Sequence, residues 1–343
     1  MYTASSGIVL LFVSMPDEGP GFGYTLQGDS SSPERDVETN LIFLATLFVV
    51  LVLVRWLSWL LLKSTHHLIT RASTMTNTGR PGKLFRSARA HVGGKFPRTM
   101  ALVEARLTPR KFTGLALTLM VLAAVYIAAL LGGLIDQLRE SEGLVEMDNR
   151  INDALGAFRT DELVHVFAFI TEWANTSAVV AVAGVTTGLL MALRHRHLVM
   201  PLWVVVLGSH ITTYAGKYGF GRERPEVVTD IMAATPSFPS GHATAAIAVY
   251  GFIAYVLSRE AVTVRRRFEI VFWSAVLVVL IGFSRMLLSL HYTSDVLAGF
   301  LVGGFWLLVG FAIAELSRSR RSAQGHQDGC GSRIQSPGTR QDS

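Results

Sequence analysis

The sequence predicts an all-α fold: a polytopic membrane bundle of helices, with a six-span core and one extra N-terminal span. Composition is the first observation behind this prediction, because hydrophobic residues make up 50% of the 343 residues and charged residues only 16%. A soluble globular domain is about 25% charged. The second observation is a series of apolar runs near the length of roughly 20 residues that a membrane-spanning helix needs.

Seven such runs divide the chain, and two of them are short. The runs 243–257 and 269–283 fall below a full crossing, so we expect both helices to gain length from their flanks. Arg55 lies late in the first run, where its side chain can snorkel toward the near interface. The predicted spans are residues 41–62, 113–135, 177–193, 198–216, 243–257, 269–283 and 296–314.

The connecting segments alternate in charge along the chain. Residues 1–40 and 136–176 are acidic, whereas residues 64–111, the loops near 194–196 and 259–267, and the segment after 318 are basic. Lys- and Arg-rich loops stay in the cytoplasm. Threading seven spans through these blocks places every basic segment on one side, with the N-terminus outside and the C-terminus inside.

These boundaries divide the chain into parts with different expected roles. The predicted parts are an extracytoplasmic segment 1–40, an extra span 41–62, a basic cytoplasmic linker 63–112, a six-span core 113–315 and a disordered cytoplasmic tail 316–343.

The segment 146–172 has apolar residues at a loose helical period, with acidic residues between them. This pattern favours one or two amphipathic helices at the outer interface. A solvated helical hairpin outside the membrane fits it equally well.

Charge and cysteine content exclude other classes. The net charge is +6, but the basic residues fall in separate blocks rather than along one face, so no nucleic-acid partner is expected. Cys330 is the single cysteine, which rules out an internal disulfide and a thiolate metal cluster. The sequence carries no signal of oligomeric state.

Three polar clusters occur at span ends, all on the predicted outer side. Each cluster alone is a weak signal, because a span-end cation is usually a snorkelling anchor and a lone histidine is usually packed or capping. The clusters are Lys217 with Arg224-Pro225, then Pro239-Ser240-Gly241-His242, and finally Ser284-Arg285 with His291 and Asp295.

Together, the clusters have the composition of a site for an oxyanion. Lys217, Arg224 and Arg285 supply three cations, and arginine matches the oxygens of a phosphate bidentately. Ser240 and Gly241 precede a span, so their backbone N–H groups would lie at a helix N-terminus, which favours anions.

Two histidines complete the expected chemistry. His291 and Asp295 are four residues apart, on one face of a helical turn. The carboxylate can therefore hold one imidazole nitrogen and make the other more nucleophilic. His242 is placed to protonate a leaving oxygen. No group of Asp, Glu, His and Cys resembles a metal site, so no metal or other cofactor is expected and cations must stabilise the charge.

At this point the sequence resembles a known family, the type 2 phosphatidic acid phosphatase superfamily. Its signature is Lys-x6-Arg-Pro, Pro-Ser-Gly-His and Ser-Arg-x5-His-x3-Asp, and every signature position is intact here, in order, from Lys217 to Asp295. The resemblance covers about residues 113–315. The first span and the segment 64–111 lie outside it.

The resemblance implies a mechanism and a role for each signature residue. His291 would attack phosphorus to form a phosphohistidine, oriented by Asp295, while His242 would act as acid and then as base. Ser284 would serve structure, and Arg222 and Glu223, which fall in the variable spacer, receive no role. The residues expected to hold the phosphate are Lys217, Arg224, Ser240, Gly241 and Arg285.

The expected function is therefore an integral membrane phosphatase acting on a lipid phosphate monoester or pyrophosphate, without a metal. Its partners would be the bilayer and a lipid phosphate such as phosphatidate or undecaprenyl pyrophosphate. The expected location is a bacterial inner membrane, with the active site facing outward. Two alternatives are a lipid phosphotransferase and a non-catalytic lipid-binding membrane protein; an intact signature disfavours the second.

Overall fold

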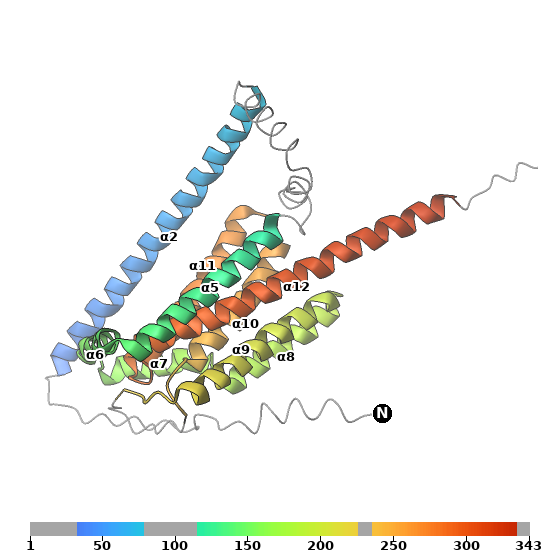
Figure 1. Ribbon diagram of the computed structural model, residues 1–343. Coiled ribbons are helices and arrows are strands. Elements are labelled where there is room, and N and C mark those ends of the chain that lie inside the picture. Colours follow the sequence, from blue (N-terminus) through green and yellow to red (C-terminus); the bar gives the residue numbers. More distant parts are fainter. Residues whose placement is uncertain (1–32, 79–114, 226–234, 335–343) are drawn as a thin grey trace, which may run out of the picture.

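The computed structural model describes residues 33–78, 115–225 and 235–334, and its described residues form helices with no strand (Figure 1). The predicted all-α class is confirmed. In chain order the helices are α2 (Pro33–Thr78), α5 (Leu115–Glu140), α6 (Glu142–Gly156), α7 (Asp161–Glu172), α8 (Thr176–Ala192), the 3-10 turn η1 (Arg196–Leu198), α9 (Val199–Phe220), α10 (Gly241–Glu260), α11 (Val264–Leu287) and α12 (Thr293–Ile334).

Six of the described helices contain a segment long and apolar enough to cross a membrane. The predicted span 177–193 corresponds to α8, which has 17 residues. It joins α7 at a bend of 42°, and the two together would make a seventh span. Both short predicted spans gain length from their flanks, as expected, in α10 and α11.

The segment 146–172 folds as two helices, α6 and α7, that differ in burial. Leu163 and Phe167 of α7 are buried in a cluster with Leu287 of α11. Asp148 is the one buried residue of α6. A solvated hairpin is therefore not what forms, because α7 places its apolar face against the bundle.

Helix α10 lies at the centre of the bundle, where it contacts α9, α11 and α12. One core cluster joins Leu202 and Val205 of α9 to Val249 and Phe252 of α10 and Ala314 of α12. Glycines allow the close approach between α10 and α12. A Cβ at Gly303, for example, would stand 2.6 Å from the carbonyl oxygen of Thr244. Small residues at such crossings are typical of membrane helices.

The extra N-terminal helix, α2, contacts the rest of the bundle through polar and aromatic groups. Near its N-terminal end, Asn40 donates a hydrogen bond to Glu162 at 3.1 Å and accepts one from Thr160 at 2.7 Å. Further along, Arg55 forms an ion pair with Glu269 of α11 at 2.5 Å. The expected snorkelling arginine thus has a carboxylate partner, which lowers the cost of a cation within a span.

The last helix is longer than expected. α12 runs to Ile334, so residues 316–334 are helical where the sequence analysis expected a disordered tail. The first proline after Thr293 is Pro337, so no proline interrupts this helix. Parts of three predicted segments lie outside the described residues. These are residues 1–32 of the segment 1–40, most of the linker 63–112, and residues 335–343 of the tail.

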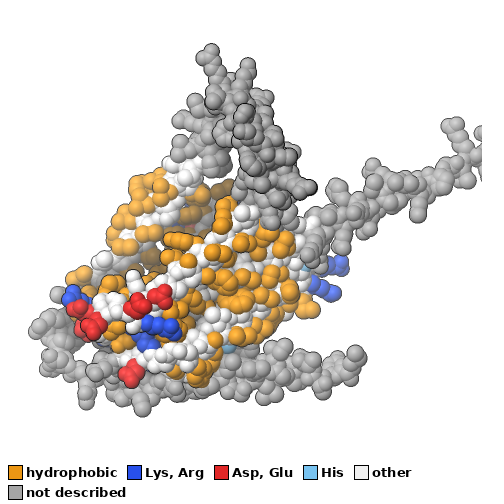
Figure 2. Space-filling view, in the orientation of Figure 1, with side chains coloured by type: hydrophobic (Ala, Val, Ile, Leu, Met, Phe, Trp, Pro, Cys, Tyr) orange, Lys and Arg blue, Asp and Glu red, His pale blue; other side chains and the backbone are white. Residues whose placement is uncertain are grey.

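The described surface matches a bundle placed across a membrane. Figure 2 shows a mainly hydrophobic flank, with charged side chains gathered at its two ends. Acidic side chains appear at the end that carries α6, together with basic ones, while the opposite end shows basic side chains in this view. The three signature clusters lie at the ends of α9, α10 and α11 that share the side of α6 and α7.

Candidate active site

The first cluster follows the end of α9. Gly221 ends this helix in the left-handed conformation, with φ of 60°, and donates its N–H to the carbonyl of Lys217 at 3.0 Å. Glycine tolerates this conformation without steric cost. The chain then turns away from the helix axis and places Arg224 beside the returning segment that begins at Thr235.

Thr235 links the two cations of this cluster. Its hydroxyl accepts hydrogen bonds from Lys217 Nζ at 2.8 Å and from Arg224 Nη2 at 3.3 Å. Arg224 Nη1 also donates to the carbonyl of Leu290 at 2.9 Å, next to His291. Lys217 is buried, at 5% exposure. The first cluster is thereby fixed against the third.

The second cluster forms the start of α10. Ser240 occupies the N-cap position, but its side chain makes no capping hydrogen bond. Its fully buried Oγ has no hydrogen-bond partner among the described residues. Gly241 and His242 are the first two residues of α10, where backbone N–H groups lack partners within the helix. A serine hydroxyl and a helix N-terminus therefore meet at one point.

The third cluster lies in the turn between α11 and α12. Ser289 adopts a left-handed conformation, with φ of 55°, and reverses the chain after α11. As a result, the backbone N–H groups of Leu290 and His291 donate to the carbonyl of Arg285 at 3.0 and 3.2 Å. Arg285 reaches Thr171 of α7 at 3.3 Å. Ser284 donates to the Ile281 carbonyl at 2.6 Å, within α11.

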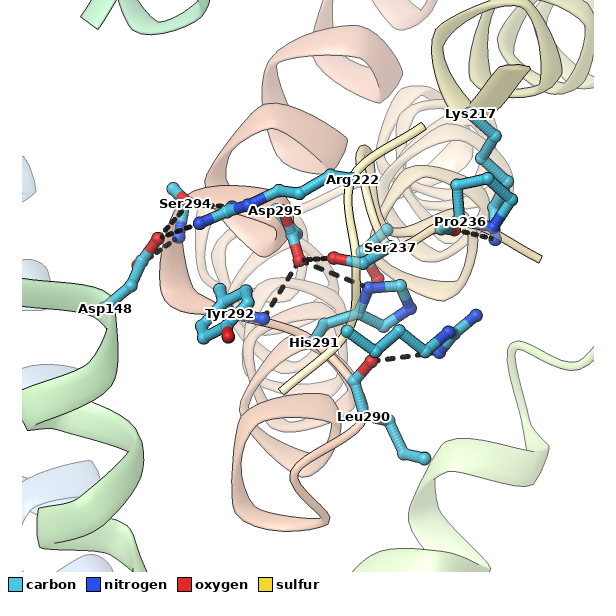
Figure 3. Close-up of polar contacts among 12 residues, drawn as sticks. Asp148, Lys217, Arg222, Pro236, Ser237, Leu290, His291, Tyr292, Ser294 and Asp295 are labelled. Atoms are coloured by element: carbon cyan, nitrogen blue, oxygen red, sulfur yellow. Dashed lines mark hydrogen bonds and ion pairs between the residues drawn. The ribbon is translucent and has the colours of Figure 1, made fainter. Parts of the chain in front are cut away.

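His291 and Asp295 lie side by side and are both almost completely buried (Figure 3). The Nδ1 atom of His291 is 3.6 Å from Oδ2 of Asp295, slightly beyond hydrogen-bond distance. Neither ring nitrogen has a hydrogen-bond partner among the described residues. Because Nδ1 faces the carboxylate, Nε2 is the nitrogen directed away from it. A buried imidazole nitrogen of this kind can meet an incoming electrophile.

The surroundings of His291 favour its neutral form. Burial, together with the positive charges of Arg224 and Arg285, lowers the pKa of His291 to about 3, although Asp295 acts in the opposite direction. The imidazole is thus uncharged at neutral pH. A neutral ring keeps the lone pair that a nucleophile needs.

Asp295 is held by groups that the sequence analysis did not assign. Its Oδ2 accepts hydrogen bonds from Ser237 Oγ and from the backbone N–H of Tyr292, the latter at 3.0 Å. Its Oδ1 accepts one from Arg222 at 2.6 Å. The carboxylate therefore has three donors besides the nearby imidazole, and its orientation is fixed from both sides.

Arg222 and Asp148 are the charged residues that sequence reasoning missed. Arg222 lies in the variable spacer of the first motif, and Asp148 lies on α6, outside the signature. The side chain of Arg222 donates to Asp148 at 2.8 Å. Burial opposes the charge on Arg222, but Asp295 and Asp148 outweigh it and raise the pKa of Arg222 above its ordinary value.

The arrangement is suited to holding an anion with two negative charges. The charges of Arg224 and Arg285 act on the buried imidazole, and Lys217 is linked to Arg224 through Thr235. A hydroxyl and a helix N-terminus add neutral donors. Among the described residues, no three side chains of His, Cys, Asp or Glu are grouped as a metal site would require. The sequence-predicted residues thus come from three separate segments to one side of the bundle.

Comparisons with known proteins find similarity over part of the chain. The model of the PAP2 superfamily matches residues 198–318, which include every predicted site residue. Phosphatidylglycerophosphatase B of Bacillus subtilis (strain 168) is 39% identical over 93 residues, or 26% of this chain. That match covers 46% of the relative, so the chain spans about half the length of the curated relative it matches.

A solved structure shares the fold. A crystal structure of a transmembrane PAP2-type phosphatidylglycerolphosphate phosphatase from Bacillus subtilis superposes with a TM-score of 0.52 and 23% identity, covering 55% of this chain and 93% of that one. The crystal structure of Aquifex aeolicus LpxE gives a TM-score of 0.39 and 18% identity, covering 50% of this chain and 96% of that one. Residues 198–318 of this chain therefore match the PAP2 superfamily over a segment that contains the intact signature.

Proposed function

We propose that this protein is an integral membrane phosphatase that hydrolyses a lipid phosphate monoester or pyrophosphate. The observation that carries the proposal is the buried, neutral imidazole of His291, whose Nδ1 faces Asp295 and whose surroundings contain Lys217, Arg224 and Arg285. A nucleophile oriented by a carboxylate beside several cations is what phosphoryl transfer requires.

The proposed reaction has two steps. Nε2 of His291 attacks phosphorus, the bond from phosphorus to the leaving oxygen breaks, and His242 gives that oxygen a proton. Water then attacks the phosphohistidine, His242 takes a proton from the water, and inorganic phosphate leaves. Asp295 accepts a hydrogen bond from the Nδ1–H, without taking the proton, and stabilises the positive charge that the ring gains in the first step. The distance of 3.6 Å needs to shorten by less than an ångström when substrate binds.

Charge stabilisation comes from the protein itself in this proposal. The phosphate would contact Lys217, Arg224 and Arg285, the hydroxyl of Ser240 and the N–H of Gly241. The Ser240 hydroxyl is a buried group that gains a partner when an anion binds. The reaction would therefore proceed without a metal ion, since three cations replace it.

The substrate would be a lipid that enters from the bilayer. The relative in Bacillus subtilis is named for phosphatidylglycerophosphate, and we include this lipid with phosphatidate and undecaprenyl pyrophosphate as candidates. The site would face the exterior of a bacterial plasma membrane, because the basic loops near 194–196 and 259–267 are at the opposite ends of the same helices.

Two other functions would use parts of the same site. A lipid phosphotransferase would form the same phosphohistidine and pass the phosphate to an alcohol in place of water. A non-catalytic lipid-binding protein would bind the phosphate without turnover. The buried nucleophile favours an enzyme, because binding alone needs cations and not a neutral imidazole oriented by a carboxylate.

The test is phosphate release by the purified protein in detergent from each of the three lipids, with and without EDTA. We expect turnover of at least one lipid, unchanged after chelation and inhibited by vanadate, and no turnover in His291→Ala. Brief incubation with ³²P-labelled substrate followed by alkaline quenching should label wild type only. An active His291→Ala variant, or a chelated wild type that regains activity with magnesium, would contradict the mechanism. Transfer of the phosphate group to an added alcohol would indicate a phosphotransferase.

A further inference from the structure

Arg222 has a contact set that no other described arginine shares. Its guanidinium donates to Asp295 Oδ1 at 2.6 Å, to Ser294 Oγ at 2.7 Å and to Asp148 Oδ2 at 2.8 Å. It also lies over the ring of Tyr292, with 4.4 Å from the guanidinium carbon to the ring centroid. Figure 3 shows it between the two carboxylates. The planar fork of arginine suits this arrangement, because it can hold two carboxylates at once.

Both carboxylate oxygens of Asp148, on the other side of Arg222, accept hydrogen bonds. Asp148 is 1% exposed, and its oxygens accept from the backbone N–H of Ser294 at 3.0 Å, from the Ser294 hydroxyl and from Arg222. A buried carboxylate is costly unless it is paired and hydrogen-bonded. Asp148 therefore ties α6 to the first turn of α12, and it fixes Arg222 in one position.

As a consequence, the two oxygens of the Asp295 carboxylate have different partners. Arg222 occupies Oδ1, so that Oδ2 is the oxygen that faces His291. Rotation of the carboxylate would exchange these partners and break the bond to Arg222. The guanidinium thus sets the face of Asp295 that the imidazole meets.

Charge provides the second argument. Asp148 and Asp295 are two buried carboxylates close to a site for a dianion, and they would repel it without compensation. Arg222 lies between them and is kept charged by both. It leaves the charges of Lys217, Arg224 and Arg285 to act on the substrate.

We propose that Arg222 and Asp148 are positioning residues for the reaction. Asp148 holds Arg222, Arg222 holds Asp295, and Asp295 orients His291. The inference rests on the proposed function and deepens it, because it assigns roles to one residue outside the signature positions and to one helix outside the matched segment. Neither residue contacts the phosphate; they act by holding Asp295 for the nucleophile.

Arg159 provides a matched control. It is also a half-buried arginine on this side of the bundle, and it ties the α6–α7 junction to α11 by donating to the Leu287 carbonyl at 2.7 Å and to Asn152 at 2.8 Å. Among the described residues, its hydrogen bonds go to Leu287 and Asn152 and not to Asp295 or His291. Its loss would weaken the same corner of the fold without disturbing the carboxylate.

The experiment compares Arg222→Ala, Asp148→Asn, the double variant and Arg159→Ala, by kcat and KM on a soluble aryl phosphate and by thermal unfolding. For Arg222→Ala we expect kcat to fall about 10²-fold, as for a small misplacement of a reacting group, with little change in KM. Asp148→Asn should lose less, and the double variant should be no worse than Arg222→Ala, because both act through Asp295. Arg159→Ala should keep kcat close to that of wild type.

Chemical rescue separates positioning from a merely structural role. Millimolar guanidinium chloride should restore part of the kcat of Arg222→Ala, while sodium chloride at the same ionic strength should not, and neither should change Arg159→Ala. If Arg222→Ala fails to fold, Arg222→Lys takes its place, with an expected loss of kcat and preserved inhibition by vanadate. Wild-type kcat in Arg222→Lys and Asp148→Asn, or equal losses in Arg222→Ala and Arg159→Ala, would overturn the inference. Absence of turnover in wild type would instead refute the proposed function.

Discussion

Gly299 of α12 lies so close to Ser240 that a Cβ at Gly299 would stand 2.6 Å from the Ser240 carbonyl oxygen. The same region is joined by a backbone hydrogen bond of 3.0 Å from the Ser240 N–H to the Asp295 carbonyl. The second and third clusters of the signature are thus held together by backbone contact, where a side chain could not adapt. The distance between the phosphate-binding turn and the carboxylate depends on this contact.

Replacing Gly299 by alanine should therefore damage the site. The neighbouring atom is a backbone oxygen, so α12 must move relative to α10, at a cost of about 1–3 kcal/mol for overpacking. We expect a lower unfolding temperature and a loss of turnover of about tenfold or more. Gly184→Ala on α8 is the control, because a Cβ there would meet nothing within 4 Å. Equal turnover in the two variants would show that the contact between α10 and α12 does not set the site.

His242 should matter most for substrates with a poor leaving group. An alkoxide leaves slowly unless it is protonated, whereas the phosphate released from a pyrophosphate needs less help. His242→Ala should thus lose about 10²–10⁴-fold on a lipid monoester, the usual range for general acid catalysis, and much less on a pyrophosphate or an activated aryl phosphate. The measurement is kcat on the three substrates. A uniform loss would exclude His242 as the acid.

The low pKa of His291 also predicts how stability depends on pH. Between about 3 and 6.5, the unfolded chain binds a proton on this residue and the folded protein does not, so the free energy of unfolding falls as the pH falls. The loss should reach about 2 kcal/mol at pH 5. His291→Gln removes this term. Thermal unfolding at pH 7 and pH 5 should therefore show a larger drop for wild type than for the variant.

The membrane orientation can be checked at two exposed residues. Val262, in the turn between α10 and α11, is 90% exposed, and the side chain of Glu146 on α6 is 63% exposed. After Cys330 is replaced by serine, a membrane-impermeant maleimide applied to intact cells should label a cysteine at 146 and not one at 262. The reverse pattern would place the active site in the cytoplasm. Labelling of both positions after membrane disruption is the control.

The sequence predicted the helical class because apolar runs are local signals, and the spacing of the signature residues is local too, while their roles stay a prediction. An apolar run indicates a span wherever it occurs. Residues four apart, such as His291 and Asp295, lie on the same face of a helical turn. The longer α12 escaped prediction because a polar composition can still continue a helix that has already started.

Arg222 and Asp148 could not be predicted for a different reason. Arg222 resembles any interfacial arginine until its two carboxylates are known. Asp148 is one of several acidic residues on an amphipathic helix, and it alone of the residues of α6 is buried. The acidic residue of α6 that becomes buried is the one that contacts α12, here through the Ser294 N–H. Such a tertiary contact cannot be predicted from the sequence of α6 alone. The pair of Arg55 with Glu269 was missed on the same ground, since its partners are far apart in sequence.

The burial of Asp148 has a consequence for how small the protein can be made. The segment that matches the family model begins at residue 198. A shortened protein starting there would keep every signature residue. It would also leave Arg222 with a single carboxylate and the serine of the α12 first turn without its acceptor. A shortened protein that keeps these contacts therefore has to begin before α6, upstream of the segment that matches the family model.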